Sequence, residues 1–147
     1  MSDGDNLIKA TLSKGILDVA VKQANRSTIE SFKTGAVLFD KNKNIVEAGC
    51  SHVPLYTWLK DKRSVHAEDD VLDKIVHIGD RSSLSMLVYT IGRSGNHTYS
   101  SKPCKICAER LRNSDISNLY YLEKCNDGSW TLNEESPHQL IERSNYA

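Results

Sequence analysis

The spacing of apolar side chains divides the chain into stretches with a helical period and short runs typical of buried strands. Residues 7–25 have the spacing of one amphipathic helix, with apolar side chains at Ile8, Leu12, Ile16, Val19 and Ala20. Three further stretches are expected to be helical, and these are 66–77, 104–113 and 134–143.

Strands are predicted where apolar residues run together between turn signals. The five expected strands are 35–39, 45–50, 84–91, 119–122 and 129–132. The polar turn 40–44 joins the first two strands into a hairpin, and Asn126-Asp127-Gly128 turns the chain between the last two. Residues 52–65 and 92–103 have no clean period and are expected to be loops. The order αββαβαββα predicts an α/β fold in which helices cover a sheet.

Length and composition indicate one globular domain over residues 1–147, with 39% hydrophobic and 26% charged residues. Basic and acidic residues number 19 each, so the formal net charge is zero. Proteins that bind polynucleotide backbones usually carry a basic excess. A small substrate is therefore favoured, although a local basic patch would be enough for a nucleic acid.

Neither a membrane span nor a secretory signal is expected. The chain contains no apolar run of the length that crosses a bilayer. Its start, Met1-Ser2-Asp3-Gly4-Asp5, is acidic where a signal peptide is basic and then apolar. A cytoplasmic location follows, and there a C-x-x-C pair indicates a metal or redox site before a structural disulfide.

Two short motifs carry the candidate chemistry, His66-Ala67-Glu68 and Pro103-Cys104-Lys105-Ile106-Cys107. Each is weak alone, because C-x-x-C pairs also occur in redox sites, in zinc ribbons and by chance. Their order and placement strengthen them, since each opens a predicted helix directly after a loop.

Two thiolates and one imidazole would give Zn²⁺ three protein ligands and leave its fourth position to water, which is the arrangement of a catalytic zinc site. The partial positive charge at a helix N-terminus would help to keep Cys104 and Cys107 as thiolates. Zinc lowers the pKa of a bound water to about 7. Glu68 would then move protons, and the backbone N–H of Ala67 is one candidate donor to the reaction intermediate.

The combination H-x-E followed by P-C-x-x-C resembles the zinc-dependent cytidine/deoxycytidylate deaminase superfamily, over roughly residues 7–132. The run Ser31-Phe32-Lys33-Thr34-Gly35-Ala36 is similar to the S-x-F-x-V-G-A run of cytidine deaminases. Ser101-Lys102-Pro103-Cys104, the later Tyr-Tyr strand and the Asn-Asp-Gly turn are similar to small deoxycytidylate-deaminase-like proteins, including phage ones.

The resemblance implies a three-layer αβα cytidine-deaminase-like sandwich with a mixed five-stranded sheet in the strand order 2-1-3-4-5. It also implies zinc on His66, Cys104 and Cys107, Glu68 as the proton shuttle, and assembly as a homo-oligomer, either a dimer or a tetramer. One departure concerns the run Gly49-Cys50-Ser51-His52-Val53-Pro54. Cytidine deaminases usually have G-C-N-x-E-N there, with the Asn and Glu on the ribose. Ser51 and Val53 replace these two residues, which weakens the case for plain cytidine as the substrate.

Substrate contacts are expected from residues near the motifs and in the flanking loops, namely Ala67, Ser51, His52, Phe32, Trp58, Arg63 and Arg93. Trp58 either packs its loop onto the body of the protein or stacks on a base. Most basic residues of the loops are expected to be a solvated rim, with one or two of them holding a 5′-phosphate. Cys50 and Cys125 are interpreted as small buried hydrophobic residues rather than ligands.

The leading hypothesis is a deaminase of a free cytosine nucleotide or nucleoside, preferably dCMP, that releases the uracil product and ammonia. The first alternative deaminates cytosine or adenine within RNA or single-stranded DNA. The second is a non-catalytic zinc-binding scaffold, against which the presence of Glu68 argues. Redox chemistry through the C-x-x-C pair is the least favoured, because thioredoxin-like motifs lack an upstream H-x-E.

Overall fold

The structure is a computed structural model that describes residues 3–29, 32–53, 65–92, 98–99 and 102–144. Its helices are α1 (Asp3–Thr11), α2 (Lys14–Arg26), α3 (Ala67–Lys74), α4 (Lys105–Asn113) and α5 (Pro137–Ser144). Its strands are β1 (Phe32–Phe39), β2 (Ile45–Cys50), β3 (Ser85–Gly92), β4 (Thr98–Tyr99), β5 (Asn118–Lys124) and β6 (Trp130–Glu135). None of the helices in these ranges is long and apolar enough to cross a membrane.

The sheet is mixed, with the strand order β2-β1-β3-β5-β6. β1 runs antiparallel to both β2 and β3, β3 is parallel to β5, and β6 returns antiparallel to β5. This confirms the expected mixed sheet of five strands. The two-residue β4 lies off this path, where Tyr99 pairs with Thr90 of β3. The prediction of a loop throughout 92–103 was wrong at this point, because two residues are too few for a hydrophobic period to reveal.

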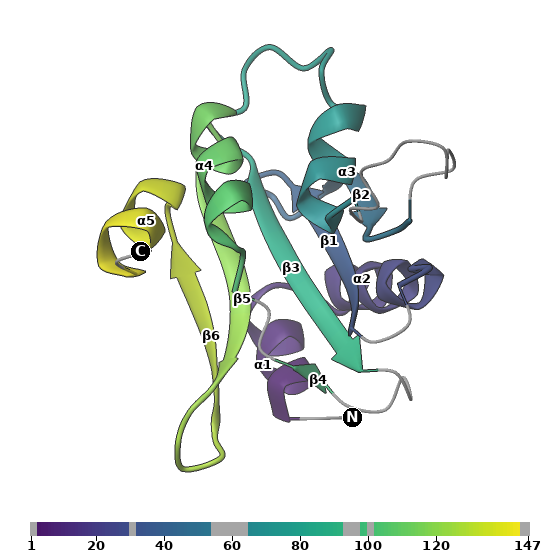
Figure 1. The fold of residues 1–147 in the computed structure, drawn as a ribbon, viewed down its shortest axis with the longest axis vertical. Helices are drawn as coiled ribbons and strands as arrows, with labels where there is room; N and C mark the ends of the chain where they lie inside the picture. Colours follow the sequence, from purple (N-terminus) through teal and green to yellow (C-terminus); the bar gives the residue numbers. More distant parts are fainter. Residues whose placement is uncertain (1–2, 30–31, 54–64, 93–97, 100–101, 145–147) are drawn as a thin grey trace.

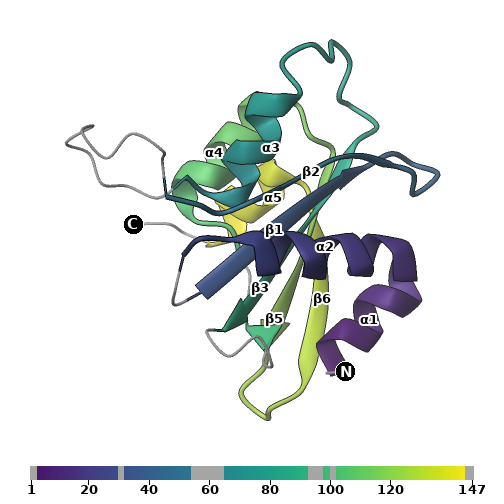
Figure 2. The ribbon, with the colours of Figure 1, turned by 90° about the vertical axis from the view of Figure 1, so that its right-hand side faces the viewer.

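Helices cover both faces of the sheet, which makes the three layers (Figures 1 and 2). Successive side chains of a strand point to opposite faces, so the two central strands contribute to two separate cores. Ala36, Leu38, Met86 and Val88 pack with α3, α4 and α5. Val37, Phe39, Leu87 and Tyr89 pack with α1 and α2.

The expected helix over 7–25 is two helices, because Ser13 stops one and starts the next. Ser13 has extended backbone angles, and its hydroxyl accepts a hydrogen bond from the backbone N–H of Ile16 at 3.0 Å. This N-cap satisfies one of the N–H groups that every helix start leaves unpaired. Ile8, Leu12 and Ile16 are buried on both sides of the break. The apolar spacing therefore continues across Ser13, because the cap does not change which side of the two helices is buried.

The last helix begins later than expected, at Pro137, because β6 continues to Glu135. Ser136 and Gln139 form a reciprocal cap, in which each backbone N–H donates to the other residue's side chain at 3.0 and 3.1 Å. Proline fits the first helical position, where its missing N–H leaves no helical bond unmade. The cap and the proline together fix where α5 starts.

Candidate metal centre

The three predicted ligands converge at the starts of two helices on one face of the sheet. His66 is the residue that precedes α3, and Cys104 is the residue that precedes α4. Nδ1 of His66 lies 3.1 Å from Sγ of Cys107 and 3.7 Å from Sγ of Cys104. All three ligand atoms lie within 4.8 Å of one another, although 38 to 41 residues of sequence separate the histidine from the cysteines.

These separations fit a tetrahedral ion. Zn–S bonds of about 2.3 Å and Zn–N bonds of about 2.0 Å place the nitrogen and sulfur ligands roughly 3.6 Å apart at a tetrahedral angle. The two N···S distances fall on either side of that value. Cys107 is buried, whereas His66 and Cys104 are exposed. The donor set therefore suits Zn²⁺, and its exposed side leaves room for a water or a substrate.

The negative charges around Cys107 also favour the binding of a cation at this centre. Burial raises the pKa of the Cys107 thiol, and the negative charges of Glu68 and Cys104 raise it further. A divalent ion held by these residues would lower the pKa of the Cys107 thiol, because a bound cation favours the thiolate. α4 has no acidic residue in its first turn, so the positive end of its dipole acts on the cysteines without opposition from its own side chains.

Glu68 lies in the first turn of α3, beside the ligands, and only 4% of it is exposed. Burial raises the pKa of its carboxyl, while its own backbone N–H, the charge of His66 and the Cys107 thiol act in the opposite direction. A carboxyl whose pKa is raised by burial keeps its proton more readily than an exposed one, which suits a group that must both accept and deliver a proton in general acid–base catalysis.

An ion pair that the sequence did not suggest holds the two helices together. A guanidinium nitrogen of Arg110 in α4 lies 2.8 Å from Oδ2 of Asp69 in α3. The other oxygen of Asp69 is buried and has no hydrogen-bond partner among the described residues. The pair joins α3 to α4 close to the ligands, in addition to the buried core that the two helices share. Only the packing of α3 on α4 brings Asp69 and Arg110 together, so no spacing in the sequence could have indicated this ion pair.

The expected substrate residues occupy different environments. Ala67 is fully buried as the first residue of α3, and Phe32 is 54% exposed at the start of β1. His52 is half-buried, with Nδ1 3.0 Å from the carbonyl oxygen of Cys50. The Ser51 hydroxyl lies 2.8 Å from that of Ser27 and accepts a hydrogen bond from a backbone N–H of β1.

Trp58, Arg63 and Arg93 fall outside the described residues. Contact of each of these seven residues with a substrate stays a prediction.

The two cysteines outside the motifs differ from expectation. Cys50 is half-buried at the end of β2, and Cys125 is exposed, so burial of Cys125 was wrongly predicted. Cys125 lies in the turn between β5 and β6, where its backbone N–H donates to the carbonyl of Ser129 at 2.7 Å. A hairpin turn lies at the surface, so a cysteine there stays accessible.

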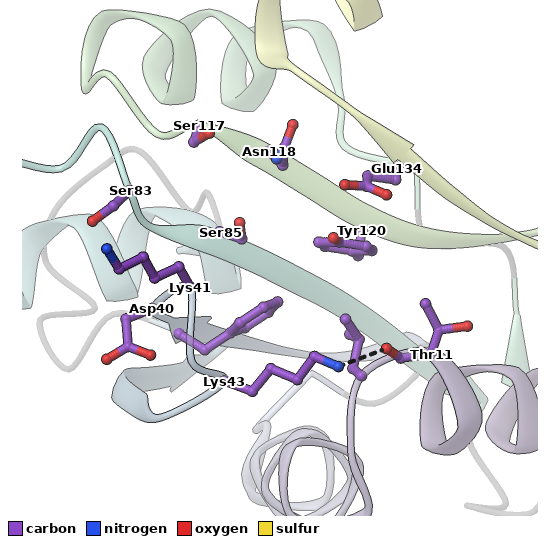
Figure 3. Close-up of a pocket in the computed structure, with 12 residues that line it drawn as sticks. Thr11, Asp40, Lys41, Lys43, Ser83, Ser85, Ser117, Asn118, Tyr120 and Glu134 are labelled. Atoms are coloured by element: carbon purple, nitrogen blue, oxygen red, sulfur yellow. Dashed lines mark hydrogen bonds between the residues drawn. The ribbon is translucent and has the colours of Figure 1, made fainter.

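A hollow of about 490 Å³ lies away from the motifs, where β1 ends and β3 and β5 begin (Figure 3). Serine hydroxyls, an amide and two lysines line much of it, including Ser83, Ser85, Ser117, Asn118, Lys41 and Lys43. α3, which begins beside the metal centre, comes after the end of β2 in the chain. Because β2 is antiparallel to β1, the end of β2 lies at the start of β1 and not at its end. The hollow is therefore at the other end of the sheet from the metal centre.

Comparison with known proteins finds a family model that spans both motifs. A family model described as the cytidine and deoxycytidylate deaminase zinc-binding region matches residues 11–123. No match to a curated protein sequence reaches significance.

Among solved structures, cytidine deaminase from Burkholderia pseudomallei is similar, with a TM-score of 0.59 and 16% identity over 86% of this chain and 93% of that one. Cytidine deaminase from Mycobacterium leprae has a TM-score of 0.49 and 16% identity over 88% of this chain and 93% of that one. At 16% identity, the similarity to the Burkholderia pseudomallei structure establishes the fold alone. Any statement about the chemistry must rest on the residues of the site.

Proposed function

From the premise that this chain belongs to the cytidine and deoxycytidylate deaminase family, we propose that it is a zinc-dependent hydrolase that deaminates a cytosine nucleotide or nucleoside, with dCMP preferred. The observation that carries the proposal is the convergence of His66, Cys104 and Cys107 beside the buried carboxyl of Glu68. A three-ligand donor set and an adjacent proton carrier are the two parts that hydrolytic removal of an amine requires.

Zinc held by the three ligands would supply a water whose pKa is lowered to about 7. Glu68 would take one proton from the water as the water oxygen bonds to the ring carbon that bears the amine, and would deliver this proton to the neighbouring ring nitrogen. The same carboxyl would then move the remaining proton from the new hydroxyl to the amine, so that the carbon–nitrogen bond breaks, ammonia leaves and the oxygen stays as the carbonyl of the uracil product. Burial of Glu68 keeps competing water away from the carboxyl during these transfers.

The preference for a nucleotide over plain cytidine rests on the end of β2. The Ser51 hydroxyl is already engaged with Ser27 and with the backbone of Thr34, so it has little capacity left for a ribose. Val53, 49% exposed, offers no polar side-chain atom for one. A phosphate held by Arg63 or Arg93 would replace that recognition, and a neutral chain with local basic residues suits such a substrate.

The test is a panel of free bases, nucleosides, nucleotides and oligonucleotides assayed for ammonia release. Glu68→Gln keeps the shape of the side chain and removes its proton transfer, so we expect turnover to fall by roughly 10²–10⁴-fold while bound zinc is unchanged. Glu142→Gln, on the exposed side of α5, is the matched control and should retain full turnover. Turnover of the Glu68→Gln variant at the wild-type rate would contradict the proposed role.

The panel also separates the alternatives. If Arg63→Ala and Arg93→Ala both leave dCMP turnover unchanged, the phosphate contact is wrong. Competition by unlabelled oligonucleotide would favour a deaminase of RNA or single-stranded DNA. A zinc-loaded chain that releases ammonia from no member of the panel would favour the non-catalytic scaffold. A homo-oligomer is expected in each case and is measured by light scattering.

A further inference from the structure

A second group of metal-ligating side chains lies outside the motif centre. Cys50 is the last residue of β2, His52 follows two residues later, and Asp70 lies one turn inside α3. One ligand atom from each side chain lies within 4.8 Å of those of the other two. All three residues are half-buried. This is a different set of donors from His66, Cys104 and Cys107, although both groups use α3.

The packing of α3 on β2 brings Asp70 to this place (Figures 1 and 2). Gly49 makes the approach possible, because a Cβ there would lie 2.6 Å from Oδ2 of Asp70. That same oxygen accepts hydrogen bonds from the backbone N–H of Cys50 at 3.1 Å and pairs with the ammonium of Lys74 at 3.2 Å. The carboxylate is therefore held in one position against the end of the strand.

Each of the three side chains keeps a donor atom available. Both contacts of Asp70 fall on Oδ2, which leaves Oδ1 free of partners among the described residues. Sγ of Cys50 has no hydrogen-bond partner within the same residues. The ring of His52 has Nδ1 3.0 Å from the carbonyl oxygen of Cys50. A carbonyl only accepts, so Nδ1 carries the proton and Nε2 presents its lone pair, the tautomer that metal-binding histidines commonly show.

We propose that Cys50, His52 and Asp70 form a second metal site, separate from the motif centre, that binds Zn²⁺ or a similar divalent transition metal. One sulfur, one imidazole nitrogen and one carboxylate oxygen are all ordinary zinc ligands. The thiolate and the carboxylate bring two negative charges to the site, and the Lys74 ammonium pairs with the oxygen of Asp70 that is not assigned to the ion. This revises the interpretation of Cys50 as a small buried hydrophobic residue. The bound ion ties the end of β2 to α3, the helix that also carries Glu68.

The experiment measures zinc per chain by elemental analysis after dialysis against a zinc buffer. Wild-type protein is expected to hold about two ions, one for each group. Cys50→Ala and His52→Ala should each hold about one, because two remaining donors bind zinc weakly. Cys125→Ala is the matched control, since it removes an exposed cysteine that belongs to neither group, and it should keep both ions. Circular dichroism of each variant confirms that the chain is folded.

A wild-type stoichiometry of one that neither Cys50→Ala nor His52→Ala lowers, or two ions retained by either of these variants, would overturn the second site. Cys104→Ala separates this site from the proposed function. It removes an exposed ligand of the motif centre only, so the variant should lose deaminase turnover and keep one ion that is then lost on adding Cys50→Ala. Retention of that ion by the folded double variant would also contradict the proposal.

Discussion

Replacing Gly35 by alanine should destabilise the protein strongly, because α2 lies directly on this residue of β1. A Cβ at Gly35 would lie 2.6 Å from the carbonyl oxygen of Ala20 and 2.7 Å from the backbone nitrogen of Ala24. Ordinary contacts of a Cβ begin at 3.4 Å, so the helix would have to move by several tenths of an ångström.

The nearest atoms determine the size of the effect. Both belong to the backbone of a helix, and neither can rotate away as the end of a side chain could. Overpacking of a core costs about 1–3 kcal/mol, and we expect Gly35→Ala to lie at the upper end, near 3 kcal/mol. The buried residues of α2, among them Ile16 and Leu17, would lose contact as the helix moves.

Urea unfolding followed by far-ultraviolet circular dichroism measures this difference in the free energy of unfolding. Gly79→Ala is the matched control, because nothing lies within 4 Å of the added Cβ, and its effect should stay within about 0.5 kcal/mol. If Gly35→Ala also fell within about 0.5 kcal/mol of wild type, the close packing of α2 on β1 would be refuted.

Three further predictions concern other parts of the molecule. Ser13→Ala removes the N-cap of α2 and should lower the free energy of unfolding by about 1 kcal/mol; an unchanged urea midpoint would argue against the cap. Arg110→Gln leaves the Asp69 carboxylate without its cation and should cost about 1 kcal/mol, most of it recovered in the double variant with Asp69→Asn.

Burial, together with the hydrogen bond and charge of Glu134, raises the pKa of Tyr120 to about 12 from 10.0. The stability that this raised pKa contributes is full below pH 10 and is lost as the pH rises towards 12. The difference in absorbance at 295 nm between wild type and Tyr120→Phe should titrate near pH 12, and a midpoint near 10 would contradict the raised pKa of Tyr120.

Most of the layered fold could be predicted because apolar spacing reports which side of each element is buried. It could not report where an element stops when the buried side continues, as it does through Leu12 and Ser13. The backbone cap at Ser13 decides that boundary, through a hydrogen bond that involves no apolar residue. β4 escaped prediction for another reason, since its pairing with β3 depends on tertiary contact and not on a local pattern.

The convergence of His66 with Cys104 and Cys107 could be predicted, because each of the two motifs opens a helix and their combination resembles a known family. The contacts that support this centre could not be predicted. The pairing of Asp69 with Arg110 requires α3 and α4 to lie side by side, and the approach of Asp70 to Cys50 requires a glycine at position 49. Both depend on how two elements pack, which a single sequence shows only after the fold is known.

The placement of His66 and Cys104 just ahead of their helices separates the chemistry from most of the helical sequence that follows. A residue inserted late in α3 or α4 would turn only the part of the helix beyond it, and both donors would keep their positions. An insertion ahead of Ala67 or Lys105 would instead move His66 or Cys104 away from the other residues of the motif centre. A change in length is therefore least tolerated in the first turn of each helix, while the distal turns must still keep their buried residues, such as Val71 and Leu111.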